Sequence, residues 1–143
     1  MPINSRAKGA AGEREFAKTL HDELGVTLAR NLEQTRDGGH DLVIVDAAHP
    51  LAPRLNRYAF EVKRYAITKP ALIHQWWQQA VEQAERADKL PALAYRGNRE
   101  PWRVVVPLCA LSRRFPRWPA LELTASLDVA GFAALVREGH GER

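Results

Sequence analysis

Two short runs of strand-forming residues lie between two long segments of helical periodicity, and this order limits the folds open to the chain. Residues 5–24 and 68–89 repeat apolar side chains at helical spacing, whereas residues 41–46 and 58–63 are rich in β-branched or aromatic residues. Four further strands are expected, over 26–30, 92–96, 102–108 and 121–124. A last helix is expected to begin at Ser126 and end at Gly139. The order predicts an α/β fold with a mixed central β-sheet flanked by helices.

Length and composition agree with a folded, soluble protein. The 143 residues are 45% hydrophobic and 27% charged, a balance that supports a packed core without disulfides. The single cysteine, Cys109, has no partner cysteine and no zinc-binding pattern around it. No apolar run reaches the length of a membrane span, and residues 1–12 do not resemble a signal peptide. We therefore expect an intracellular, cytoplasmic protein that forms one domain over residues 1–143.

The charge of the chain indicates a class of partner. A net charge of +4 and a pI near 9.6 favour a polyanion, because lysine and arginine gain affinity when they replace the counterions of phosphates. Many basic proteins bind no nucleic acid, so the charge alone leaves both interpretations open. A recognisable site is needed to choose between them.

Glu13 stands out in the first predicted helix because it shares the apolar face. It lies three, four and seven residues before Phe16, Ala17 and Leu20, whereas Glu15 falls on the opposite face. A buried carboxylate is costly unless a cation pairs with it, so Glu13 should have an arginine, a lysine or a metal ion beside it. The alternative is that Glu13 lies in an exposed first turn of the helix.

Two acids and a lysine mark the neighbouring strands. The two-residue period of a strand sends Glu61 and Lys63 to one face of residues 58–63, and Asp41 opens the preceding strand. We expect these two strands to form a hairpin around a proline-bearing connection, which would bring Asp41 into the same polar pocket. The alternative is that Glu61 and Lys63 form an ordinary surface pair, because Glu-x-Lys is a common sequence.

Taken together, Glu13, Asp41, Glu61 and Lys63 predict a catalytic magnesium site. Hard divalent cations such as Mg²⁺ prefer carboxylate, carbonyl and water oxygens, and two or three acids are what such a site needs. The ion would polarise a scissile phosphate and activate a water molecule, which Lys63 would orient. We therefore expect Mg²⁺, with Mn²⁺ as a substitute, and Glu13, Asp41 and Glu61 as its ligands.

The motifs from residue 8 to residue 108 resemble those of the archaeal-type Holliday junction resolvases and their phage and bacterial relatives in the PD-(D/E)XK nuclease superfamily. Residues 12–16 (Gly-Glu-Arg-Glu-Phe) are similar to that family's opening helix. Residues 39–41 (Gly-His-Asp) resemble the motif with the first metal-binding aspartate, and residues 60–63 (Phe-Glu-Val-Lys) the second acid with its lysine. The resemblance implies a restriction-endonuclease-like fold, with a core over about 5–108 and a C-terminal strand-helix extension over 109–143.

The resemblance also implies an activity and a set of DNA contacts. The chain is expected to be a metal-dependent endonuclease of branched DNA such as Holliday junctions, active in DNA recombination or repair and encoded by a phage or prophage. Lys8, Arg30, Arg36 and Arg64 are the basic residues expected to contact DNA. Two alternatives stay open: a DNA-binding or assembly protein that keeps the fold without cleaving, and a nicking or restriction-like nuclease on linear duplex DNA.

A homodimer is expected as well, because the strands of a branched junction are cut in pairs and each chain carries one site. The contact is expected from exposed parts of Trp76 and Trp77, whose spacing marks them as core or interface residues. The arginine- and aromatic-rich segment 112–119 is the other candidate for this contact.

Overall fold

The computed structural model describes residues 5–32, 40–117 and 120–139, with the backbone alone described for residues 5–8. In chain order the elements are α1 (Ser5–Leu24), β1 (Leu28–Arg30), β2 (Leu42–Ile44), α3 (Ala52–Leu55), β3 (Tyr58–Arg64), α4 (Pro70–Ala87), β4 (Leu90–Arg96), β5 (Arg103–Pro107), β6 (Thr124–Asp128) and α5 (Val129–Glu138). Short 3-10 helices occupy Leu108–Ala110 and Leu121–Leu123. Within these described ranges no helix combines the length and the apolar character needed to cross a membrane.

Four strands form the main sheet, in the order β3, β4, β5, β6. β3 and β4 run parallel, so the chain must cross over between them, and α4 makes that crossing. β4 pairs antiparallel with β5, and β5 pairs antiparallel with β6. The sheet is therefore mixed, and the predicted α/β fold is confirmed.

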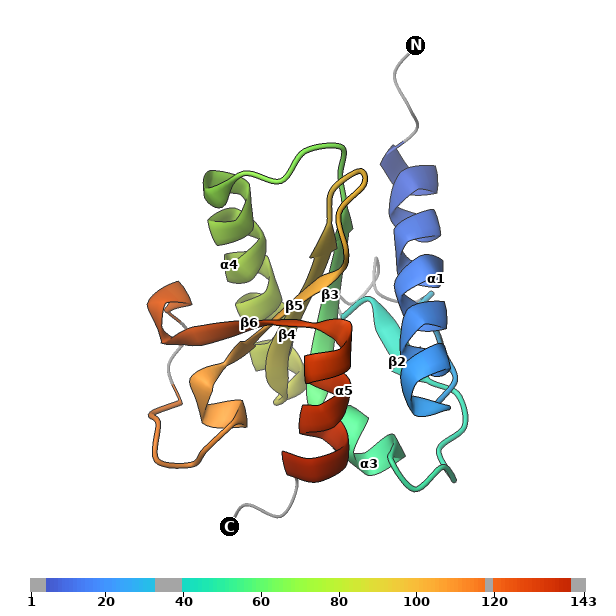
Figure 1. Cartoon of the computed structure of the whole chain (residues 1–143), viewed down its shortest axis with the longest axis vertical. Helices are drawn as coiled ribbons and strands as arrows, with labels where there is room; N and C mark the ends of the chain where they lie inside the picture. Colours follow the sequence, from blue (N-terminus) through green and yellow to red (C-terminus); the bar gives the residue numbers. More distant parts are fainter. Residues whose placement is uncertain (1–4, 33–39, 118–119, 140–143) are drawn as a thin grey trace.

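Helices cover both faces of this sheet, with α1 and α5 on one side and α4 on the other (Figure 1). Along β3, Phe60 and Val62 join the core under α1 and α5, which leaves Glu61 on the α4 side of the strand. α4 buries Trp76 and Trp77, which are 3% and 1% exposed, against β4 and β5. Because both tryptophans are core residues, the predicted dimer contact through exposed parts of them is wrong.

The strand that follows Asp41 pairs with β1 and not with β3. β1 and β2 form a separate two-stranded antiparallel sheet, in which Leu28 lies opposite Ile44. The predicted hairpin between residues 41–46 and 58–63 is therefore wrong. The start of β2 still meets β3, because the backbone N–H of Asp41 donates a hydrogen bond to the carbonyl oxygen of Phe60 at 2.8 Å. The main chain of Asp41 is thus hydrogen-bonded to β3, where the two-stranded sheet adjoins the four-stranded sheet.

The C-terminal elements begin later than the sequence predicts. Residues 121–124, expected as a strand, start as a 3-10 turn, and the strand β6 follows. Ser126 lies inside β6, so the prediction that it begins the last helix is wrong. Asp128 caps α5 instead, since its side chain accepts a hydrogen bond from the N–H of Gly131 at 2.6 Å.

β6 and α5 also complete the main core. Phe132 of α5 is fully buried, and its ring lies 5.3 Å from that of Tyr58 and 5.9 Å from that of Phe60. Both contacts are edge-on, a favourable arrangement of aromatic rings. Phe132, which belongs to the predicted C-terminal extension, thus packs against the strand that carries Glu61.

Candidate active site

Glu61 and Lys63 lie side by side on β3, as the two-residue period predicts. The Lys63 ammonium nitrogen stands 3.3 Å from Glu61 Oε2, and Glu61 is only 8% exposed. That burial rules out the alternative of an ordinary surface pair. The other oxygen of the carboxylate, Oε1, is buried and has no hydrogen-bond partner among the residues that the structure describes. Glu61 can therefore accept a further positively charged ligand.

Asp41 is held beside this pair by the backbone of β3. Its side chain is buried, and Oδ2 accepts a hydrogen bond from the N–H of Val62 at 2.7 Å. The backbone of Asp41 bonds to Phe60, as described above, so one residue is fixed to the strand on both sides of Glu61. This double attachment orients the Asp41 carboxylate toward the middle of β3 without any contribution from a hairpin.

Several negative charges are buried close together at the site, and they shift the pKa values of its carboxyl groups. Burial raises the pKa of Asp41 to about 8, with further increases from Glu61 and Glu13, against the Val62 hydrogen bond and Lys63, which lower it. Burial also raises the pKa of Glu61, where Lys63 opposes the shift and Glu13 adds to it. The three carboxylates therefore lie in one another's electric field, in a region with little water to screen them.

Glu13 is buried on α1, and its carboxylate has the cationic partner that the sequence analysis requires. Arg30 of β1 donates a hydrogen bond from Nε to Glu13 Oε1 at 2.7 Å. The Glu13 side chain is 9% exposed, so the alternative of an exposed first turn is wrong. The pair joins α1 to β1 and gives the buried Glu13 carboxylate a cationic partner.

The donors present suit a hard divalent cation, although they do not form a closed cage. Within the described ranges, no group of three His, Cys, Asp or Glu side chains is arranged to hold a metal ion. The charge of Glu61 raises the pKa of Asp41 more than the charge of Glu13 does, so Asp41 and Glu61 are the more strongly interacting pair of carboxylates. Two carboxylates with water completing the shell is a usual way to bind Mg²⁺, and the unpaired Glu61 Oε1 points to such a ligand.

The residues expected to contact DNA divide into three cases. Arg36 lies outside the described residues, and so does the side chain of Lys8. Arg64 is held within the protein, because its guanidinium donates to Asn98 Oδ1 at 2.8 Å and lies 3.7 Å from Glu15 Oε1. The Arg30 side chain is 32% exposed even though it pairs with Glu13. A DNA contact of each of the four remains a prediction.

A basic groove beside Arg30 was not anticipated. The groove has a volume of about 580 Å³ and runs between α1 and β1, where Arg14, Lys18 and His21 of the helix face Arg30 of the strand. Residues 14, 18 and 21 follow the spacing of one helical face, which is a signal that the sequence does contain. Lys18 is partly neutralised, since it pairs with Asp22 at 3.0 Å on the exposed surface.

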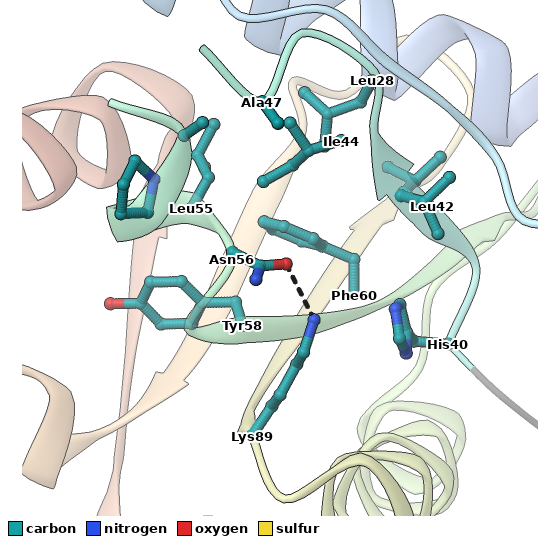
Figure 2. A pocket seen from close by; sticks show the side chains of 13 residues that line it. Leu28, His40, Leu42, Ile44, Ala47, Leu55, Asn56, Tyr58, Phe60 and Lys89 are labelled. Atoms are coloured by element: carbon teal, nitrogen blue, oxygen red, sulfur yellow. Dashed lines mark hydrogen bonds between the residues drawn. The ribbon is translucent and has the colours of Figure 1, made fainter. Parts of the chain in front are cut away.

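His40, the residue before Asp41, lines a separate pocket. Figure 2 shows His40 and Lys89 at one rim of this pocket and the apolar side chains of Leu42 and Phe60 along its wall. The cavity has a volume of about 420 Å³. Burial, with the charge of Lys89, lowers the pKa of His40, so the imidazole is neutral at pH 7. The pocket adjoins the candidate active site but contains none of its acids.

Comparison with known proteins agrees with this architecture. A family model described as "Phage putative PDDEXK endonuclease" matches residues 4–121. Protein D14 of Escherichia phage T5 is 26% identical over 116 residues, which cover 74% of this chain and 72% of that protein. No solved structure matches the chain. Since the family model spans well over half of the sequence, including Glu13, Asp41, Glu61 and Lys63, the chain belongs to this family of PD-(D/E)XK endonucleases, with the restriction-endonuclease-like α/β fold.

Proposed function

We propose that the protein is a divalent-metal-dependent endonuclease that hydrolyses phosphodiesters of DNA, with Glu13, Asp41, Glu61 and Lys63 as its active-site residues. The observation that carries the proposal is the buried Asp41–Glu61 pair, with Lys63 at 3.3 Å from Glu61 and one Glu61 oxygen left without a partner. A protein that only bound DNA would gain nothing from acids in this position, because they repel phosphates. Membership in an endonuclease family supports the same reaction.

Each residue of the site has a part that its contacts support. Asp41 and Glu61, and Glu13 in a secondary position, would hold Mg²⁺ or Mn²⁺, and family members of this class generally depend on such a cation. When bound, the cation supplies a Lewis acid for the phosphate and an activated water molecule. Lys63 keeps a positive charge beside Oε2 of Glu61, where it can orient the attacking water or offset charge on the phosphorus. Arg30 holds Glu13 in place.

The substrate we propose is branched DNA such as a Holliday junction, cleaved by a homodimer during recombination or repair. The resemblance to junction resolvases supports this choice, and the relative from a phage agrees with a phage or prophage origin. The basic groove between α1 and β1 offers a surface for a DNA strand beside the site, because Arg30, one of its lining residues, pairs with Glu13. Lys8, Arg36 and Arg64 are further proposed contacts. Cleavage of linear duplex is the competing possibility.

The direct test is a cleavage assay on four substrates of matched sequence: a four-way junction, a flap, a linear duplex and a single strand. We expect Mg²⁺ or Mn²⁺ to support cleavage and EDTA to abolish it. Asp41→Asn and Glu61→Gln should each lower kcat/KM by roughly 100-fold or more, because each removes a charge that a metal ion requires. DNA binding should persist in both variants, since removing a carboxylate reduces repulsion of phosphates.

Glu82→Gln is the matched control, because Glu82 is an exposed carboxylate of α4 that lies outside the site and does not line the basic groove. It should cleave like the wild type. Full activity of Asp41→Asn or Glu61→Gln would refute the proposed site. Cleavage of the linear duplex at the rate of the junction would refute the branched substrate while leaving the nuclease intact.

A further inference from the structure

Tyr65 continues the face of β3 that carries Glu61 and Lys63. Its backbone N–H donates to the carbonyl oxygen of Arg96 at 3.1 Å, so the parallel pairing with β4 extends one residue beyond β3. Alternation along a strand then places the side chains of Glu61, Lys63 and Tyr65 on one side. The ring confirms this, because it lies against Trp76 of α4, the helix on that side of the sheet.

The Tyr65 ring is exposed and backed by other rings. It is 42% exposed, and its centroid lies 4.8 Å from that of Trp76, which in turn lies 6.1 Å from Tyr95. Trp76 is buried, so it supports the Tyr65 ring from the protein side, and the exposed fraction of Tyr65 leaves part of its side chain accessible. Ile67, two residues further on, is 65% exposed and adds a second apolar side chain to this loop.

The spacing of residues along β3 relates the Tyr65 ring to the proposed site of phosphodiester cleavage. Two residues along a strand cover about 6.6 Å, which is comparable to the separation of neighbouring phosphates along one DNA strand. A strand whose scissile phosphate lies at Glu61 and Lys63 therefore brings an adjacent nucleotide to Tyr65. Aromatic side chains bind bases by stacking, which requires a base face that no neighbouring base covers. Bases within an intact duplex offer no such face.

We infer that Tyr65 is the stacking platform for a base next to the scissile phosphate, and that the substrate carries an unpaired or unstacked nucleotide at this position. The inference rests on the proposed function and narrows its substrate class to DNA with a branch point, flap or single-stranded segment at the cleavage site. Tyr65 acts on the substrate through its ring, with Trp76 as its support.

The test is a cycle that changes the protein and the DNA separately. An abasic analogue replaces one nucleotide at a time on either side of the cleavage site in the preferred substrate. We expect the wild type to lose roughly 5- to 100-fold in kcat/KM at one position, the range of a base–aromatic stack. Tyr65→Leu should lose as much on intact DNA and then be insensitive to the abasic analogue, because the two changes remove the same contact.

Two control variants and one stability measurement make the result specific. Tyr65→Phe keeps the ring and should behave like the wild type. Val45→Ala shortens an apolar side chain that is 59% exposed just after β2, and should leave the cycle unchanged. Leucine at position 65 still covers Trp76, so thermal unfolding of Tyr65→Leu should stay close to that of the wild type. Independent, additive losses from Tyr65→Leu and from the abasic analogue would overturn the inference, as would no loss from Tyr65→Leu.

The same cycle measured as binding in Ca²⁺ separates this inference from the proposed function. Coupling in binding without any cleavage in Mg²⁺ would refute the nuclease and keep the stacking platform. Cleavage without coupling in either measurement would refute the platform and keep the nuclease.

Discussion

Asp41 is the residue at which burial and charge conflict most strongly. Burial raises its pKa to about 8, whereas a free aspartate titrates near 3.8. Between these two values the folded protein holds a proton that the unfolded chain has released. The contribution of Asp41 to the free energy of unfolding of the metal-free protein therefore falls as the pH rises from about 4 to about 8, and its loss is complete above pH 8.

Asp41→Asn should accordingly stabilise the metal-free protein at pH 8. Asparagine carries no charge, and its carbonyl oxygen can still accept the hydrogen bond from the N–H of Val62. Urea unfolding in EDTA between pH 4 and pH 9 measures the effect, which should shrink toward zero as the pH approaches 4. Asp22→Asn, in an exposed ion pair, should show no such trend.

Adding Mg²⁺ should reverse the order of the two proteins. A cation bound at Asp41 and Glu61 stabilises the wild type by mass action and has little to bind in Asp41→Asn. If Asp41→Asn is less stable than the wild type at pH 8 in EDTA, the charged Asp41 carboxylate does not destabilise the metal-free protein, and the prediction is wrong.

The sequence identifies the acids of the site better than it identifies their partners. Glu13 is marked by its place on an apolar helix face, and Glu61 and Lys63 by strand alternation, because both patterns are local. The ion pair of Glu13 with Arg30 spans 17 positions, and the bond from Val62 to Asp41 spans 21. Contacts over such separations depend on how elements pack, so residue periodicity does not reveal them.

At the scale of elements, one glycine sets how closely α1 approaches β3. A Cβ atom on Gly12 would lie 2.7 Å from Cβ of Arg64, whereas a Cβ on Gly9 would have no atom within 4 Å. Gly12 directly precedes Glu13, so this close approach also fixes the depth at which the Glu13 carboxylate sits.

Gly12→Ala should therefore destabilise the protein by about 1–3 kcal/mol, because the backbone of α1 or β3 must move to relieve the clash. Gly9→Ala is the matched control and should stabilise the same helix by about 0.5–1 kcal/mol through helix propensity. Chemical unfolding of both variants gives the two values. A loss of equal size in both would show that flexibility of α1, and not its distance from β3, explains the need for glycine.

The sequence predicts the type of most elements well, but it does not predict which strands pair with each other. The run 58–63 is buried on both faces and pairs in parallel with β4, which lies beyond a whole helix in the sequence. No turn signal marks such a partner, so the nearer strand at 41–46 is the natural and wrong choice. At the C-terminus both Ser126 and Asp128 are good helix caps, and tertiary pairing of Ser126 with Val105 in the sheet leaves Asp128 as the cap.

For the whole molecule we predict a homodimer. Two cuts in a branched substrate need two sites, and each chain contributes one. Sedimentation at micromolar concentration should give twice the chain mass of 16.1 kDa, both free and on a four-way junction. Among exposed apolar side chains, Leu111 and Phe115 lie near or within the segment 112–119 and remain candidates for the contact, so Phe115→Glu should shift the protein toward monomer. A monomer in both conditions would favour a nuclease that makes single cuts.

The position of α5 determines how much of the chain must be synthesised before the active site is fully packed. Phe132 of this late helix packs against Tyr58 and Phe60, directly behind the strand that carries Glu61. A chain emerging from the ribosome makes α1, β3 and every proposed catalytic residue long before α5. Until α5 is present, the side chains of Tyr58 and Phe60 lack this packing partner, so the strand that carries Glu61 is incompletely buried on its far face. Nuclease activity should therefore appear only after α5 has been made, so that a chain still lacking α5 is harmless to the DNA of the cell that makes it.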